Sequence, residues 1–219
     1  MKPGPLLAVI LSALLSACAP GGINQLKFQP APEGARISAP RLLIEQRVPA
    51  TQLVSVRDAV DRAPVGSLIV VCSERWSAAR PWGICTHVTR KLGPDEFTDA
   101  PGIFVGGLFG GGPQITPART LFQRDVVIVL DVGVRNHHLN VLRATARKLA
   151  GTPYRVAGLL DRDGGLDCST YQNELQRAMG LADAVPFNGL WNLYLPQDAL
   201  TAPGAQVLWV GVRTLPSKP

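Results

Sequence analysis

The sequence predicts one α+β domain in which an antiparallel sheet packs against helices. Four runs of strand-forming residues, 67–72, 84–91, 96–100 and 126–132, lie between segments whose apolar residues have helical spacing, one before these runs and two after them. The first and last of these runs are almost entirely apolar, so we expect them at the centre of the sheet. With 219 residues, 46% of them hydrophobic and 17% charged, the chain has the composition of a single globular core.

Helical spacing predicts three helices. Residues 52–60 fit a short helix, and residues 140–150 fit an amphipathic helix that stops at a Gly-x-Pro sequence. A third helix begins near Cys168 and ends at Gly180. Its apolar residues follow Cys168 at intervals of three or four, which places the thiol on the buried stripe of the first turn. The run 207–212 predicts a final strand.

The charge pattern and the lack of a phosphate-binding motif argue against two functions. The chain has 22 Lys and Arg against 16 Asp and Glu, a formal charge of +6, without the run of like charges typical of a nucleic-acid tail, so no nucleic-acid partner is expected. Residues 102–117 are rich in glycine but lack a GxxxxGK[ST] sequence, which argues against phosphate binding. We expect this segment to be a loop, either a surface connection or an apolar flap beside a cleft.

The N-terminus predicts export. Lys2 precedes an apolar stretch, residues 6–15, that is too short to span a bilayer, and the sequence Leu15-Ser-Ala-Cys18 follows. This junction resembles the lipobox of bacterial lipoproteins. The resemblance implies a signal peptide over residues 1–17, cleavage before Cys18 and acylation of Cys18; an ordinary secretory signal with an unmodified cysteine is the alternative.

The predicted anchor sets the localisation and the domain limits. A lipid on Cys18 would bind the protein to a membrane. The resemblance to bacterial lipoproteins further implies that Ala19, at the next position, favours the outer membrane, facing the periplasm. Residues 18–49 are rich in Pro, Gly and small polar residues, so we expect a flexible tether there. The folded domain is then expected over residues 50–219.

Three cysteines remain after Cys18. Cys72 ends one predicted strand and Cys85 begins the next, so an exported protein could join them by a disulfide. A zinc site formed by Cys72, Cys85 and His87 is the alternative, although it lacks a fourth ligand. If the disulfide forms, Cys168 is the cysteine left over, and a leftover thiol in an exported protein is either reactive or an intermolecular partner.

Cys168 has the local context of a nucleophile. A cysteine attacks as its thiolate, which a helix N-terminus and a neighbouring imidazole both favour. Asp167 is a suitable N-cap, and the N–H groups of the first turn could stabilise an oxyanion. The histidines of the chain all precede Cys168. We expect His137 and His138 to be exposed at a helix start.

The sequence around Cys168 resembles a known family. Gly151-Thr-Pro-Tyr-Arg-Val-Ala-Gly158 followed by Leu166-Asp-Cys-Ser169 resembles the PYxxGG…DCS signature of NlpC-type papain-like peptidases. In ordinary members the histidine follows the cysteine. In this chain the histidines precede the cysteine, as in the circularly permuted, YiiX-like branch and its acyltransferase relatives. Thr86-His87-Val88 resembles the histidine strand of that branch. The resemblance covers roughly residues 67–180.

The resemblance implies a permuted papain-like domain with a Cys-His-Asp site. Cys168 would attack an amide or ester carbonyl, His87 would transfer the proton, and Asp99 would orient the imidazole. Glu96 is the alternative orienting residue. Substrate-binding positions would be Tyr154, Asp167 and Ser169, with no cofactor.

Two functions follow from these expectations. The first is a cell-envelope cysteine hydrolase that cleaves a peptidoglycan peptide amide or an acyl ester. The second is an inactive papain-like lipoprotein that acts as a binding or assembly module. The second is motivated by Thr170, because the family commonly has glycine where Thr170 stands.

Overall fold

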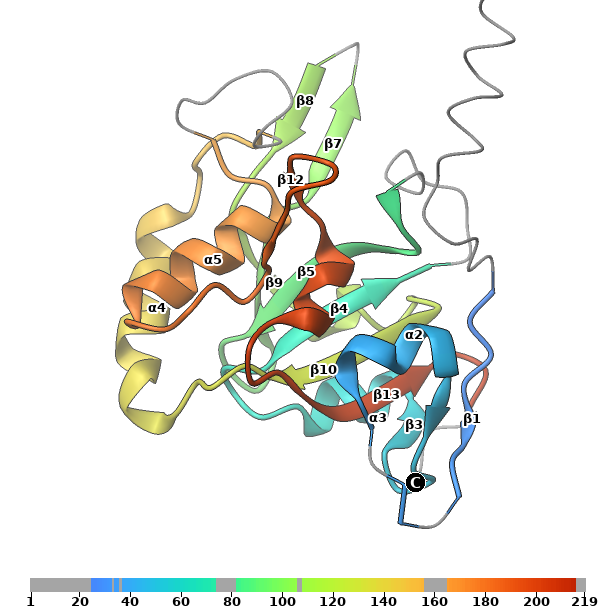
Figure 1. Cartoon of the computed structure of the whole chain (residues 1–219). Coiled ribbons are helices and arrows are strands. Elements are labelled where there is room, and N and C mark those ends of the chain that lie inside the picture. The colour runs from blue at the N-terminus through green and yellow to red at the C-terminus, as the bar shows by residue number, and fades with distance from the viewer. Residues whose placement is uncertain are drawn as a thin grey trace, which may run out of the picture.

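The computed structural model describes residues 25–32, 34–35, 37–73, 82–105, 108–155 and 165–215, with the backbone alone for 103–105 and 108–109. A seven-stranded sheet forms its centre (Figure 1). The sheet contains β3 (Leu53–Ser55), β4 (Leu68–Cys72), β5 (Cys85–Lys91), β6 (Glu96–Asp99), β9 (Gln114–Pro117), β10 (Val126–Asp131) and β13 (Gln206–Val212). The strand order is β3-β13-β10-β4-β5-β6-β9, and all neighbours are antiparallel except β3 and β13.

Helices and short strand pairs complete the fold. The α-helices are α2 (Leu42–Glu45), α3 (Val56–Arg62), α4 (Leu139–Leu149) and α5 (Cys168–Ala178), and the 3-10 helices are η1 (Ala39–Arg41), η3 (Ala118–Thr120), η4 (Asn136–His138) and η5 (Pro196–Thr201). The two-stranded pairs are β1 (Gln29–Pro30) with β2 (Arg47–Val48), β7 (Gly102–Val105) with β8 (Leu108–Gly111), and β11 (Phe187–Asn188) with β12 (Leu193–Tyr194). The α+β class predicted from the sequence is confirmed.

Each face of the sheet has its own apolar core. On β4, Leu68 and Val70 point to one core, which contains α4 and α5, whereas Ile69 and Val71 point to a second core, which contains α3. Figure 1 shows α4 and α5 side by side over the first face. Strands β4 and β10 are buried on both faces, which explains their continuous apolar sequences and confirms their predicted central position.

The glycine-rich segment 102–117 is not a loop, and that prediction is wrong. It forms the hairpin β7–β8, with Gly102 opposite Gly111, and then strand β9, which pairs with β6 at the edge of the sheet. Glycine has low strand propensity, so the composition concealed strands that backbone pairing stabilises. The predicted helix at 52–60 is also shifted: β3 comes first, and α3 begins at Val56 because the Ser55 hydroxyl accepts a hydrogen bond from the Asp58 N–H.

The packed domain begins earlier than the sequence predicted. A flexible tether was expected to residue 49, but Leu26, Leu42, Leu43 and Val48 are buried in the core beside α4 and α5. The tether prediction is therefore wrong for that part of the segment. Cys18 and the predicted signal peptide lie outside the described residues, so cleavage and lipidation stay predictions. Among the helices that the structure describes, none combines the length and apolar character needed to cross a membrane.

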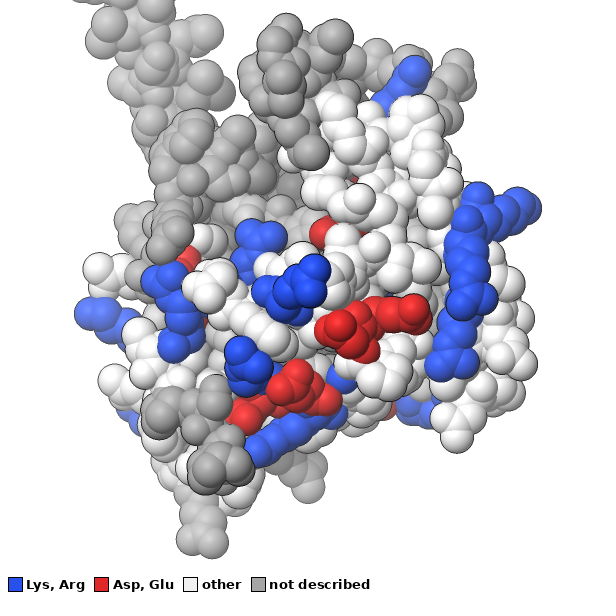
Figure 2. Space-filling model, turned by 180° about the vertical axis from the view of Figure 1, so that it is seen from behind, with Lys and Arg blue, Asp and Glu red and all other residues white. Residues whose placement is uncertain are grey.

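Basic residues do not form one continuous patch on the face seen in Figure 2. Lys and Arg side chains stand in several separate groups, with Asp and Glu side chains between some of them. On this face the basic side chains are therefore divided among separate groups.

Candidate active site

Helix α5 begins at Cys168 because Asp167 caps it. One carboxylate oxygen of Asp167 accepts hydrogen bonds from the N–H groups of Ser169 and Thr170, at 2.8 Å each. The Thr170 hydroxyl in turn accepts from the Asp167 N–H at 2.9 Å, which completes a capping box. Thr170 thus fixes the start of the helix. Within the described part of the chain, the Cys168 N–H has no acceptor and is free to donate to a ligand.

The Cys168 thiol lies at the edge of the core. The residue is 7% exposed and belongs to the apolar cluster of α4 and α5. Among the described cysteines it is the one with a free thiol. The amphipathic pattern of α5 explains this placement, since Tyr171 and Leu175, three and seven residues on, are fully buried on the same side.

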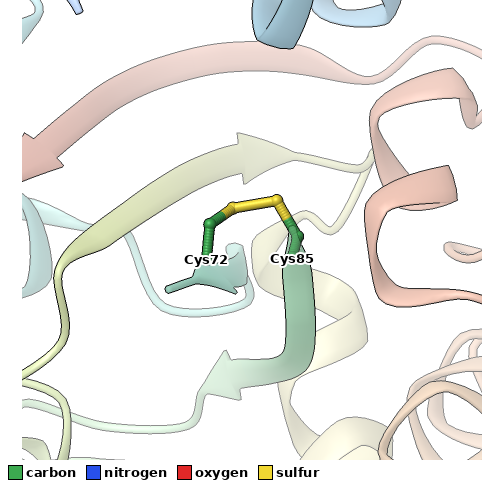
Figure 3. Close-up of a disulfide and its surroundings, with 2 residues drawn as sticks. All are labelled: Cys72 and Cys85. Carbon is green, nitrogen blue, oxygen red and sulfur yellow. A yellow bond between two sulfur atoms is a disulfide. The ribbon is translucent and has the colours of Figure 1, made fainter. Parts of the chain in front are cut away.

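A disulfide and a strand irregularity precede His87. Figure 3 shows the Cys72–Cys85 bond joining the end of β4 to the start of β5. The register shifts there: Cys72 faces Cys85 and Val71 faces His87, so Thr86 is an extra residue on β5. Such bulges reorient side chains and are common beside active sites. The predicted disulfide is confirmed, and because both thiols are consumed, the zinc alternative is wrong.

His87 contacts both of its predicted partners. Its Nε2 lies 2.7 Å from Oδ1 of Asp99, and its side chain also hydrogen-bonds to Cys168. With Nε2 bonded to Asp99, Nδ1 is the ring nitrogen left for the thiol. The side chains of His87 and Asp99 are 16% and 15% exposed, so the pair is shielded but not sealed from solvent.

These contacts set the charge of the imidazole. Burial is the largest single influence and lowers the pKa of His87, but the hydrogen bonds to Asp99 and Cys168 and the negative charges of both groups raise it. The balance is a pKa raised from 6.5 to about 10. His87 is therefore an imidazolium at neutral pH, able to donate a proton.

Asp99, and not Glu96, bonds the histidine. Asp99 is the last residue of β6 and pairs with Gln114 of the edge strand β9, which fixes the backbone of Asp99. Glu96 stands at the other end of β6 with an exposed side chain. The positions of Asp99 and Glu96 on β6 thus decide which of the two carboxylates can bond to His87.

Tyr154 lies close to Cys168. Burial, together with the negative charges of Cys168 and Asp167, raises the pKa of Tyr154 above its usual value of 10, so its hydroxyl stays protonated and can donate. The Tyr154 N–H donates to the Gly111 carbonyl at 3.1 Å, which joins this segment to the hairpin β7–β8. The segment that the loop prediction missed therefore positions a residue of the site.

The remaining predicted residues occupy supporting positions. Ser169 is 1% exposed, and within the described residues its hydroxyl has no partner. The Asp167 carboxylate is engaged in capping α5. His137 and His138 belong to η4, at the entry to α4, and His138 accepts from the Arg135 N–H. Binding of substrate by Asp167 or Ser169 stays a prediction.

Sequence reasoning missed a polar cluster behind the site. Gln172, four residues after Cys168 on α5, is fully buried and bonded to Arg90 of β5 and Thr98 of β6. A polar residue on the predicted buried stripe of the helix that begins at Cys168 was the signal that could have revealed this cluster.

The arrangement combines a thiol, an imidazole, a carboxylate and an available helix N–H. These are the groups needed for attack on a carbonyl carbon, proton transfer and stabilisation of an oxyanion. No protein-family model matches the chain, and no curated protein matches it significantly.

Proposed function

We propose that this chain is a cysteine hydrolase of the permuted NlpC-type, papain-like class. The observation that carries the proposal is the position of His87, which hydrogen-bonds to the Cys168 thiol and to the Asp99 carboxylate. The chain order of the three residues, histidine first and cysteine last, agrees with the permuted branch. An antiparallel sheet that faces a helix beginning at the cysteine supports the same class.

The first chemical step is acylation of the thiol. The Cys168 sulfur, as thiolate beside the His87 imidazolium, attacks the carbonyl carbon of the substrate and forms a carbon–sulfur bond. The carbonyl oxygen becomes an oxyanion, which the Cys168 N–H is placed to stabilise and to which the Tyr154 hydroxyl is a second candidate donor. His87 then gives its proton to the leaving nitrogen or oxygen, the bond to the carbonyl carbon breaks, and a thioester remains.

The second step is hydrolysis of the thioester. Neutral His87 takes a proton from a water molecule, and the resulting hydroxide attacks the thioester carbon. The carbon–sulfur bond breaks, the acid product leaves, and the thiolate–imidazolium pair is restored. Asp99 keeps the ring in the tautomer that presents Nδ1 to the thiol and stabilises the imidazolium in both steps.

The substrate belongs to the cell envelope in this proposal. We infer a signal peptide, lipidation at Cys18 and a location at the outer membrane facing the periplasm. The disulfide supports an oxidising compartment, because structural disulfides persist outside the cytoplasm. A peptide amide of peptidoglycan and an acyl ester of a membrane lipid are the two bonds within reach of such an anchored enzyme.

Variants of the three residues test the hydrolase directly. Cys168→Ala is expected to abolish turnover of wall-peptide fragments and acyl esters while the domain stays folded. His87→Gln is expected to lower turnover by about 10³-fold or more, whereas His137→Gln, which changes an exposed histidine in η4, should leave it unchanged. Retained hydrolysis in Cys168→Ala would refute the proposal.

An inactive envelope-binding module is the second candidate. The observation that favours an inactive module is the low exposure of Cys168, 7%, which is typical of a buried structural cysteine. The pH dependence of Cys168 alkylation by iodoacetamide separates the two functions. An activated thiol reacts below neutral pH, and an inert one reacts slowly and in alkaline solution alone.

A further inference from the structure

Three buried polar residues join the three elements of the site. Arg90 comes from β5, Thr98 from β6 and Gln172 from α5, and each is 0% exposed. These are the strands and the helix that supply His87, Asp99 and Cys168. We call Arg90, Thr98 and Gln172 the buried polar cluster.

Hydrogen bonds fix the orientation of the Gln172 amide. Its Oε1 accepts from Nε of Arg90 at 3.1 Å, and its Nε2 donates to the Thr98 hydroxyl at 2.9 Å. The same hydroxyl accepts from the Arg90 N–H at 3.0 Å, and the Arg90 guanidinium also donates to the Gly66 carbonyl. Because its two ends have different partners, the amide has one favourable orientation.

The buried polar cluster is not an arrangement that stability alone would favour. Its hydrogen bonds to Arg90 use neutral acceptors, and Nη2 of Arg90 has no partner within the described residues. Burial lowers the pKa of Arg90 to about 9, which reflects an unfavourable environment for the cation. Apolar residues of similar volume are often no less stable at such positions.

The cluster stands where backbone pairing ends. Strands β5 and β6 pair at two positions, Arg90 with Thr98 and Lys91 with Phe97. Asp99 lies one residue beyond the last of these pairs, so its distance from His87 is not fixed by the β5–β6 ladder. On the helix side, Gln172 lies one turn after Cys168, on the same face of α5.

We propose that Gln172 is a positioning residue that sets the distance between the nucleophile helix and the His87–Asp99 pair, by linking α5 to β5 and β6. The inference rests on the proposed function, since it assigns Gln172 a role in the same thiol–imidazole pair. Gln172 bonds to Arg90 and Thr98 and would touch neither the substrate nor the reacting atoms. Its effect reaches the site through Thr98 and Arg90.

The test measures the iodoacetamide alkylation rate of Cys168 against pH in the full chain. Gln172→Met keeps the volume but removes both hydrogen bonds, and Thr98→Val removes the hydroxyl between the strands and the helix. Both are expected to slow alkylation at about pH 6 by roughly tenfold and to move the profile toward that of a free cysteine. If Gln172→Met fails to fold, Thr98→Val alone provides the test, because the Thr98→Val substitution leaves the hydrogen bond between Arg90 and Gln172 in place.

Gln176→Met is the matched control. Gln176 is a buried glutamine one turn further along α5, and its Nε2 donates to the Val132 carbonyl at 2.7 Å. Gln176→Met should lose about as much stability as Gln172→Met but keep the wild-type alkylation profile. Wild-type profiles in both Gln172→Met and Thr98→Val would overturn the inference while leaving the hydrolase intact. Reaction in alkaline solution alone in the wild-type protein would overturn the hydrolase proposal itself.

Discussion

The ring of Tyr154 lies against the backbone of Gly102, so close that a Cβ atom at residue 102 would stand 2.6 Å from the ring carbon Cζ. Glycine is therefore required at this first position of β7 if the tyrosine is to stay beside Cys168. The contact connects the glycine-rich hairpin to the site, since Tyr154 also donates its N–H to Gly111.

Gly102→Ala should displace the Tyr154 ring and reduce turnover. We expect a loss of about tenfold in kcat, because a donor near the developing oxyanion is moved. Gly189→Ala is the control, since a Cβ atom there meets open space. Steady-state kinetics of the two variants, with thermal unfolding to verify folding, measure the difference. Equal activity in both would show that the position of Tyr154 does not matter to the reaction.

Asp99→Asn should lower kcat strongly while the domain stays folded. The amide can still hydrogen-bond to His87 but supplies no charge to stabilise the imidazolium, so we expect a loss of about 10- to 10⁴-fold in kcat. Glu96→Gln, at the exposed start of the same strand, is the matched variant and should behave as wild type. If both variants lose activity alike, Asp99 has no special role.

The raised pKa of His87 predicts how stability depends on pH. Its folded pKa of about 10 exceeds its ordinary value of 6.5, so its contribution is complete below about 6.5 and is lost as the pH rises through about 10. The free energy of unfolding of the wild type, relative to His87→Gln, should therefore decrease from about pH 6 to about pH 10. Urea unfolding of the wild type and of His87→Gln at several pH values measures this decrease. A pH-independent difference would contradict the assigned contacts of His87.

The disulfide should contribute substantially to stability. Cys72 and Cys85 are separated by 13 positions, and closing a loop of this size constrains the unfolded chain by about 3 kcal/mol. The double variant Cys72→Ser/Cys85→Ser should lose about that amount in urea unfolding, and a reducing agent should destabilise the wild type but not the variant. An unchanged free energy of unfolding would show that the bond adds no stability.

The sequence was most informative where side-chain pattern and burial coincide. The runs that became β4 and β10 are apolar at every buried position, so strand type and central place could both be predicted. The helix beginning at Cys168 was predictable because Asp167 supplies a cap and the apolar residues repeat at helical intervals.

The parts that could not be predicted depend on tertiary contacts. Strand β9 and the hairpin before it are made of glycine-rich sequence, and their backbone pairing has no counterpart in local propensity. The N-terminal segment has two-residue strands and a four-residue helix, too short for any periodicity, yet Leu42 and Val48 are buried.

The site itself was partly predictable. His87 and Asp99 were candidates through the order of residues in a resembling family, but strand pairing was needed to select Asp99 over Glu96. Gln172 was missed because a glutamine on a helix is usually exposed, and its burial follows from contacts with Arg90 and Thr98 that are distant in sequence.

The pairing of Cys168 with His87 is tested most directly by an NMR titration of the His87 ring in the wild type and in Cys168→Ala. We predict a pKa of about 10 in the wild type and a lower pKa in the variant, because the thiol partner that helps to hold the proton is gone. A His87 pKa near 6.5 that is the same in both proteins would contradict the pairing and, with it, the proposed hydrolase.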